Sequence, residues 1–317
     1  MPDSAITLRR VSKRYGATAA LDATTLDVRR GELFGLIGPD GAGKTTTIRV
    51  MCGLLRADSG EVRVAGRDPV RDHRAVSERV GYLSQRFSLY GDLSIDENIA
   101  FFAEIHGVSG YRPRRERLLE MTRLSAFRAR RADRLSGGMK QKLALACTLV
   151  HQPEIILLDE PTTGVDPVSR REFWKLLSEF LAEGLTIVMA TPYLDEAERC
   201  ARVALLHEGR TLAIDQPAHL QRAFTGDLYE VVATPHHDAY EALAGLPGLT
   251  DRQTFGDRVH VRTTGGAARV EDAVRSALAR AGVEVVAIRP IVPSLEDVFI
   301  DRVRAAGPVG RGREDQP

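Results

Sequence analysis

Lysine, cysteine and long apolar runs are all scarce in this chain of 317 residues. Five of its 44 basic residues are lysines and the other 39 are arginines, so each lysine is worth inspecting. No stretch approaches the roughly 18 consecutive apolar residues that suggest a membrane helix. Residues 1–10 contain no apolar core of a signal peptide. We therefore expect neither a membrane span nor a secretory signal.

An excess of charge of one sign is also missing. Lys+Arg 44 and Asp+Glu 43 give a formal net charge of +1, which excludes a bulk field that would attract nucleic acid. A nucleic-acid role would need a local patch instead. The three cysteines, Cys52, Cys147 and Cys200, lie far apart and form no CxxC pair. We interpret them as small buried apolar residues rather than as a metal or redox site.

The composition is typical of a soluble globular protein, with 43% hydrophobic residues, 27% charged residues and a mean hydropathy of -0.18. The length suits about two domains at roughly 150 residues each. Up to about residue 220, short apolar runs alternate with helical patterns, which predicts an α/β fold with parallel central strands. The expected strands are 33–37, 155–158 and 186–190, and the expected helices are 45–55 and 170–183.

Two further regions have patterns of their own. Residues 94–134 are arginine-rich and helical in pattern, which predicts an inserted helical subdomain at about 90–140. Beyond the expected first domain, 1–220, the pattern resets and indicates a small α+β domain at 221–304, followed by a disordered tail at 305–317. Ser294 and Asp297 have the spacing of a capping box before a last helix. The other elements expected in this domain are strands 229–234, 258–262 and 283–288 and helices 238–243 and 268–281.

The segment Gly38–Thr45 matches the phosphate-loop pattern G-x-x-x-x-G-K-[ST] at every fixed position. Its surroundings also fit, because an expected strand precedes it and an expected helix follows. Glycines let several backbone N–H groups converge on one anion, and the N-terminus of the helix adds positive potential. Lys44 would reach the β- and γ-phosphates, and the hydroxyl of Thr45 would bind Mg²⁺.

The apolar run 155–158 ends in two acids, Asp159 and Glu160. A buried strand is stiff and can hold Asp159 near the metal and Glu160 beside the attacking water. Glu160 would act as general base or orient the water. By itself the pair also fits a strand end with solvated acids. The phosphate loop makes the catalytic interpretation the stronger one.

Between the phosphate loop and the strand that ends in Asp159, residues 135–141 read Leu-Ser-Gly-Gly-Met-Lys-Gln. This segment resembles the signature motif of ATP-binding-cassette (ABC) proteins. Ser136, Gly137 and Gly138 open a second helix whose N-terminus suits an anion. The resemblance implies that they complete the nucleotide site of a partner cassette, so that two cassettes enclose two ATP molecules. It also implies a P-loop NTPase fold with a RecA-like core, N-terminal antiparallel strands and an inserted helical subdomain.

Other elements of the resemblance follow in order along the chain. Tyr15 lies where cassettes place an aromatic ring against adenine. Gln85 resembles the glutamine that contacts Mg²⁺ and water, and residues 163–166 resemble the loop that crosses the dimer interface. The resemblance assigns catalysis to Glu160, Gln85 and Lys44 and the metal to Thr45, Gln85 and Asp159. It assigns ATP binding to Tyr15, Gly38, Pro39, Asp40, Gly41, Ala42, Gly43, Lys44, Thr45, Thr46, Ser136, Gly137 and Gly138.

One departure from the family pattern affects the chemistry. Pro192 occupies the position of the switch histidine that cassettes usually carry. We expect Thr191 to cap the helix that follows, with Pro192 in its first turn, so that the fold survives. Without an imidazole near the γ-phosphate, we expect slow hydrolysis or dependence on a partner cassette with an intact switch. The alternative is that Pro192 has no catalytic consequence, because positioning and electrostatics carry most of phosphoryl transfer.

Residues 89–99, 193–198 and 293–299 resemble cassettes of type-2, daunorubicin-resistance-like ABC exporters. This resemblance implies separate transmembrane permease subunits, a location on the cytoplasmic face of the membrane, and no nucleic-acid partner. One rival is a soluble ABC protein acting on ribosomes or DNA, although Ser136 follows only 92 positions after Lys44, which leaves no room for a coiled coil. The second rival is a regulatory nucleotide-binding subunit that hydrolyses little, which Pro192 would suit.

Overall fold

The computed structural model describes residues 4–85, 88–263 and 267–307. The chain forms two compact units, one made of the residues up to Pro217 together with those from Arg302 onward, and the other Ala218–Asp301. Each unit has its own β-structure and its own core. Most of the expected tail at 305–317 lies outside the described residues, whereas residues 305 and 306 still belong to the last helix.

A six-stranded sheet forms the centre of the first unit. Its strands are β3 (Leu33–Ile37), β5 (Val80–Leu83), β6 (Ile155–Asp159), β7 (Thr186–Thr191), β8 (Arg202–His207) and β9 (Arg210–Asp215). They lie in the order β5-β6-β7-β3-β8-β9, and all neighbours are parallel except β8 and β9. Every residue of β3, β6 and β7 is buried. Continuous apolar runs such as these are expected for parallel strands covered on both faces.

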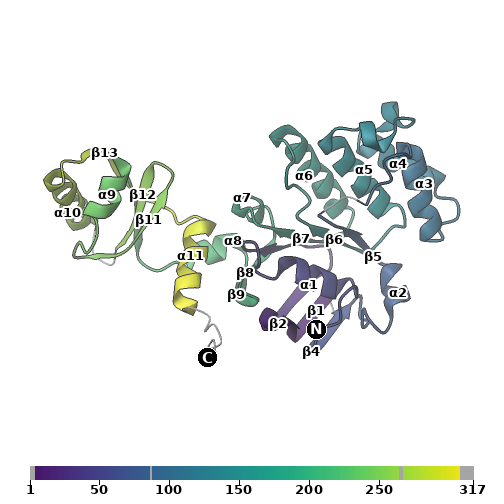
Figure 1. Ribbon diagram of the computed structural model, residues 1–317, viewed down its shortest axis with the longest axis horizontal. Helices are drawn as coiled ribbons and strands as arrows, with labels where there is room; N and C mark the ends of the chain where they lie inside the picture. The colour runs from purple at the N-terminus through teal and green to yellow at the C-terminus, as the bar shows by residue number, and fades with distance from the viewer. Residues whose placement is uncertain (1–3, 86–87, 264–266, 308–317) are drawn as a thin grey trace, which may run out of the picture. The chain divides into compact units, whose positions relative to one another are not determined.

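A smaller antiparallel sheet holds the first helix against the central sheet. Its three strands are β1 (Ser4–Tyr15), β2 (Thr18–Arg29) and β4 (Ser59–Val64), in the order β2-β1-β4. Helix α1 (Lys44–Met51) lies between the two sheets (Figure 1). Ile48 and Met51 of α1 share one buried core with Leu8 of β1 and Phe34 of β3. This packing fixes the start of α1 next to the end of β3.

Helices cover the other face of the central sheet (Figure 1). They are α3 (Ile95–Ile105), α4 (Arg112–Met121), α5 (Gly137–Leu149) and α6 (Pro167–Ala182). Residues 94–134 contain α3, α4 and two 3-10 turns, and no strand is found among them. Ser94 and Glu97 form a capping box at the start of α3, which satisfies two N–H groups that the helix cannot pair internally. Short helices α2 (His73–Ser77) and α8 (Pro217–Arg222) precede β5 and follow β9.

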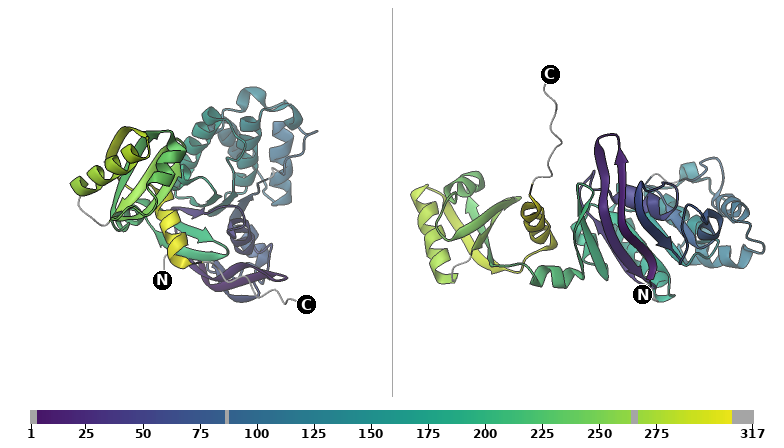
Figure 2. Two further views of the ribbon diagram at one scale, coloured as in Figure 1. Left: turned by 60° about the vertical axis from the view of Figure 1, so that its left-hand side comes forward. Right: turned by 90° about the horizontal axis from the view of Figure 1, so that it is seen from below.

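The second unit is a four-stranded antiparallel sheet with helices packed on it (Figure 2). Its elements are β10 (Asp227–Thr234), α9 (His236–Ala242), β11 (Leu249–Phe255), β12 (Arg258–Thr263), α10 (Ala267–Arg280) and β13 (Glu284–Ile291). The order β11-β12-β10-β13 and the βαββαβ sequence are those of a ferredoxin-like fold. Val231 and Val261 of the sheet form a core with Val274 and Leu278 of α10. Helix α11 (Leu295–Ala306) follows, and Asp297 N donates to Ser294 Oγ at 3.2 Å as the capping-box spacing predicts.

The α/β fold class predicted from the sequence is confirmed. The sequence patterns did not predict β11, because Leu249–Phe255 is polar and only partly buried at the edge of its sheet. An edge strand of this kind lacks the apolar alternation by which strands are recognised. Among the described residues, no helix is both long and apolar enough to cross a bilayer.

Candidate nucleotide-binding site

The loop between β3 and α1 requires glycine at defined positions. Gly41 and Gly43 have φ values of 80° and 100°, a conformation that side-chain-bearing residues rarely adopt. A Cβ atom on Gly43 would lie 2.5 Å from the carbonyl oxygen of Ala20, and one on Gly38 would lie 2.2 Å from that of Leu206. The loop therefore packs too closely against its neighbours for any other residue at these two positions. It ends at the N-terminus of α1, which favours anions.

Lys44 is buried beneath this loop, with 3% of its side chain exposed. Its Nζ donates to the carbonyl oxygens of Gly38 at 2.9 Å and Pro39 at 3.0 Å. The same atom lies 3.2 Å from Oε1 of Glu160. A buried ammonium is tolerated only when it is paired and hydrogen-bonded, and these contacts meet that requirement. The arrangement places a fixed positive charge beneath a loop whose geometry suits phosphate.

Asp159 ends β6 directly behind the loop. Its Oδ1 accepts a hydrogen bond from Thr45 Oγ1 at 2.9 Å, and its Oδ2 accepts one from the Tyr82 hydroxyl at 3.5 Å. Burial raises the pKa of Asp159 above its ordinary value, and it raises the pKa of Tyr82 to about 12. A carboxylate next to a threonine hydroxyl offers the hard oxygen ligands that Mg²⁺ prefers. The described residues contain no cluster of three or more His, Cys, Asp or Glu side chains that could hold a metal, so Mg²⁺ would need such a mixed set of oxygens.

Glu160 has a left-handed backbone, with a φ of 50°. A residue with a side chain pays about 1–3 kcal/mol for such a conformation, which persists only where its surroundings enforce it. Its backbone N–H donates to the carbonyl oxygen of Ala190 at 2.9 Å, which ties the turn to β7. Gln85 Nε2 donates to Glu160 Oε2 at 3.1 Å. Strained residues of this kind gather at functional sites, so Glu160 fits a catalytic role.

Lys44, Gln85 and Glu160 meet at an open cavity of about 510 Å³, whereas Asp159 is not among the residues that line it. Tyr15 lies at its wall and is half exposed, so its ring is accessible. Thr18 and Ala20 of β2 also line the cavity, although the sequence patterns did not single them out. The predicted site residues that line it are Tyr15, Asp40, Gly41, Gly43, Lys44, Thr45, Thr46, Gln85 and Glu160.

The signature residues do not line this cavity. Ser136 caps α5, where its Oγ accepts a hydrogen bond from Met139 N at 3.3 Å. Gly138 is explained by packing, because a Cβ there would lie 2.2 Å from Oγ of Ser169 on α6. Ser136 and Gly137 are exposed, so the start of α5 is an accessible helix N-terminus separate from the cavity of its own chain.

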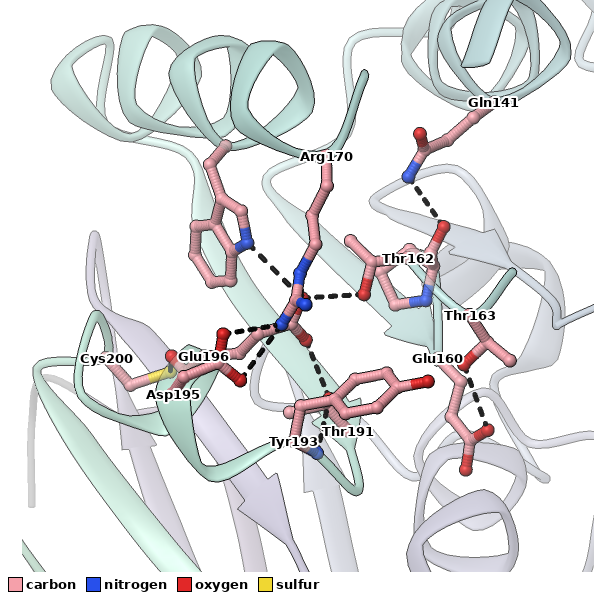
Figure 3. A network of polar contacts seen from close by, with 12 residues as sticks. Gln141, Glu160, Thr162, Thr163, Arg170, Thr191, Tyr193, Asp195, Glu196 and Cys200 are labelled. Carbon is pink, nitrogen blue, oxygen red and sulfur yellow. Dashed lines mark hydrogen bonds and ion pairs between the residues drawn. The ribbon is translucent and has the colours of Figure 1, made fainter. Parts of the chain in front are cut away.

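A buried polar network connects the turn Glu160–Thr162 to α6 and to the segment after β7 (Figure 3). Its centre is Glu196, which is fully buried and accepts hydrogen bonds from Thr162, Thr191 and Arg170. A second buried side chain, Gln141 of α5, donates to the Pro161 carbonyl oxygen at 2.6 Å. The sequence patterns assigned no role to these residues. Two features of the sequence could have pointed to them. Gln141 lies within the signature motif, and Glu196 lies within residues 193–198, which resemble exporter cassettes.

The segment around Pro192 differs from the expectation. Helix α7 (Leu194–Ala197) begins two residues after Pro192, and its N-cap is Tyr193. The prediction that Thr191 caps this helix was wrong, because Thr191 is the last residue of β7 and its hydroxyl donates to Glu196 Oε2 at 2.6 Å. Tyr193 N in turn donates to Thr191 Oγ1 at 3.1 Å. The hydroxyl therefore orders the extended link between β7 and α7.

The fold and this site define a P-loop nucleotide-binding protein: a parallel sheet, a glycine loop before a helix, a buried lysine and an acid-ending strand. Residues 21–163 match the family described as ABC transporter, and residues 216–303 match the C-terminal domain described as ATP-binding protein DrrA1-3-like. The chain belongs to the ATP-binding proteins of ABC transporters, in the daunorubicin-resistance-like group. The resemblance read from the motifs is thereby confirmed.

Individual relatives agree with this assignment. The daunorubicin resistance ATP-binding protein DrrA3 of Streptomyces coeruleorubidus is 37% identical, over 95% of this chain and 96% of that protein. The probable multidrug ABC transporter ATP-binding protein YbhF of Escherichia coli (strain K12) is 41% identical over 97% of this chain. The chain spans about half of that relative's length, 53%.

Solved structures resemble about two thirds of the chain. A structure described as the ATP binding subunit of an ABC transporter has a TM-score of 0.64 and 30% identity, over 69% of this chain and 92% of that one. A dimeric bacterial ABC transporter cassette has a TM-score of 0.60 and 28% identity, over 67% of this chain and 98% of that one.

Proposed function

We propose that this chain binds and hydrolyses Mg-ATP and thereby drives a membrane exporter. The observation that carries the proposal is the pairing of buried Lys44 with Glu160 at one cavity, beneath a glycine loop that suits phosphate. The loop N–H groups and Lys44 would bind the β- and γ-phosphates. Tyr15, exposed at the cavity wall, would pack against the adenine ring.

Glu160 is proposed as the general base or the group that orients the attacking water. In this structure its carboxylate is held by Lys44 and Gln85. A bound phosphate would compete for Lys44 and leave a Glu160 oxygen free to accept a hydrogen bond from water. Thr45, Asp159 and Gln85 would hold Mg²⁺, which neutralises charge on the phosphate oxygens when bound.

A second cassette is proposed to complete the nucleotide site. Support comes from the exposed start of α5, where Ser136 and Gly137 do not line their own chain's cavity. In a dimer these residues would meet the γ-phosphate bound by the partner. ATP would bind the closed dimer more tightly than the open one, and hydrolysis would return it to the open state. A related bacterial cassette has been described as a dimer.

Separate transmembrane subunits are proposed as the machinery that this cycle moves. Relatives carry the names daunorubicin resistance ATP-binding protein, multidrug ABC transporter ATP-binding protein and Nod factor export ATP-binding protein. These names support an export function, with the chain docked on the cytoplasmic face of the membrane through its permease. The exported substrate would be selected in the membrane subunits. Pro192 favours slow hydrolysis or reliance on a partner cassette.

The proposal is tested by measuring Mg-ATP turnover of the purified chain and of two variants. Glu160→Gln should lower turnover at least about 100-fold while nucleotide binding is retained, because only the water-activating carboxylate is lost. Glu120→Gln, an exposed position on α4, is the matched control and should leave turnover unchanged. Turnover that survives Glu160→Gln would overturn the catalytic assignment. Tight Mg-ATP binding without turnover would instead support the regulatory, non-hydrolysing alternative.

A further inference from the structure

The turn that carries Glu160 is held from behind by side chains that do not line the nucleotide cavity. On one side, Gln141 Nε2 donates to the Pro161 carbonyl oxygen at 2.6 Å. On the other side, Thr162 Oγ1 donates to Glu196 Oε1 at 2.7 Å. Both Gln141 and Glu196 are fully buried. The two residues after Glu160 are thus each fixed by a polar side chain from a different element.

The carboxylate of Glu196 joins three segments: the turn after Glu160, the end of β7, and α6 (Figure 3). Oε1 accepts from Thr162 in the catalytic turn, and Oε2 accepts from Thr191 at the end of β7 at 2.6 Å. Thr191 is next to Ala190, whose carbonyl oxygen accepts the Glu160 N–H. Glu196 therefore holds both the chain that follows Glu160 and the strand to which the Glu160 backbone is bonded.

Arg170 of α6 supplies the charge that makes this buried carboxylate tolerable. Its Nε lies 2.7 Å from Glu196 Oε1, and its terminal nitrogen lies 2.9 Å from Asp195 Oδ2. The guanidinium also lies 4.9 Å from the centre of the Tyr193 ring. Arg170 thereby ties the segment after Pro192 to the same cluster. A buried charge that has every donor in place keeps its surroundings in one arrangement.

We propose that Glu196 is a positioning residue for ATP hydrolysis, which acts by holding Glu160 in its left-handed conformation through Thr162 and Thr191. The proposal rests on the ATPase function proposed above. Pro192 offers no side-chain donor at the position where cassettes usually carry a histidine. In this chain Glu196, with Arg170, Thr162 and Thr191, connects the segment at Pro192 to Glu160, the proposed base.

The experiment compares kcat and KM for Mg-ATP in variants that keep the shape of the cluster. Glu196→Gln removes the negative charge, and Thr162→Val removes one donor without changing side-chain volume much. Each should lower kcat about tenfold and change KM less than about twofold, because the nucleotide contacts at the phosphate loop are untouched. Thr162→Ser restores the hydroxyl and should recover most of the lost kcat. Thermal unfolding of each variant is measured in parallel.

Glu172→Gln is the matched control, because it removes a carboxylate from α6, the helix that carries Arg170, where its partners are Lys142 and Arg123 rather than the turn that follows Glu160. It should leave kcat unchanged. The positioning role is overturned if Thr162→Val keeps its full kcat, or if Thr162→Ser fails to recover it. Loss confined to thermal stability would also overturn it. If the unaltered chain has no turnover that depends on Glu160, the proposed ATPase function fails. If turnover depends on Glu160 but not on Thr162, only the positioning role fails.

Discussion

The two units of the chain bury carboxylates in different ways. In the first unit, Asp159 and Glu160 lie where parallel strands end, and Glu160 has a strained backbone beside an open cavity. In the second unit, Glu230 lies within β10, where β12 and β13 flank it on both sides. Its Oε2 lies 2.8 Å from Arg258 on β12 and its Oε1 lies 2.6 Å from Arg289 on β13.

The network in the second unit continues to its last helix. His260, opposite Glu230 in the β10–β12 register, has its Nδ1 2.9 Å from Asp297 Oδ1 at the start of α11. Hydrogen bonding by Arg258 lowers the pKa of Glu230 below its ordinary value. All these groups find partners inside the unit, and no strained residue is needed to hold them. The difference indicates that the network around Glu230 stabilises the second unit. The charged groups around Glu160, in contrast, lie where a ligand can contact them.

Removing Glu230 should produce the largest stability effect of the comparison. Glu230→Ala leaves two arginines without their carboxylate, which should cost about 2 kcal/mol after allowance for the partial exposure of both guanidinium groups. Amide hydrogen exchange should then increase in β10, β12 and β13 while protection in β3 and β6 stays unchanged. Glu296→Ala, an exposed position on α11, is the control. Equal loss of protection in both units would contradict the view that each has its own core.

A substitution at Pro192 tests whether the missing switch histidine limits ATP hydrolysis by the first unit. Pro192→His should raise turnover of the assembled complex by up to about tenfold, equivalent to about 1.4 kcal/mol, because an imidazole would be added near the γ-phosphate and water. The measurement is steady-state ATP hydrolysis. Pro192→Ala removes the ring without adding an imidazole and should leave turnover within about twofold. Unchanged turnover in Pro192→His would show that the missing switch has no catalytic consequence here.

Partly buried histidines in the two units provide the smallest test of this comparison. In the first unit His151 stacks on His106, with ring centres 3.9 Å apart, whereas His260 faces a carboxylate. Burial, with a smaller contribution from His106, lowers the pKa of His151 to about 4 from 6.5. The unfolded chain therefore binds more protons between these values, and stability is lost as pH falls from about 6.5 toward 4.

His151→Phe keeps a stacked ring and removes this titration. Urea unfolding at pH 7.5 and pH 5.5 should show that the variant loses about 1 kcal/mol less than the unaltered chain over this interval. His237→Phe, at an exposed position on α9, should not change the pH dependence. An unaltered slope in His151→Phe would mean that His151 is protonated as easily in the folded chain as in the unfolded one.

Contiguous patterns predicted much of the first unit. The phosphate loop, the expected strand before it and the acid-ending strand are local in sequence, and parallel strands bring their carboxyl ends to one edge. The structure accordingly places Lys44, Thr45, Gln85 and Glu160 at one cavity. The start of α7 was missed because it depends on Thr191, whose hydroxyl is engaged by a side chain five residues further on. The edge strand β11 was missed because its burial is slight.

The sequence by itself determined the class of fold, the phosphate-binding loop and the acids that face it, because glycine conformation, apolar periodicity and residue chemistry act over short stretches of chain. Only the tertiary structure decided how Glu160 is held. Its support comes from Gln141, Thr191 and Glu196, which belong to different elements and meet only after the sheet and helices have packed. Hydrogen bonds between such distant residues leave no periodic signal, since each depends on the position of every element between them.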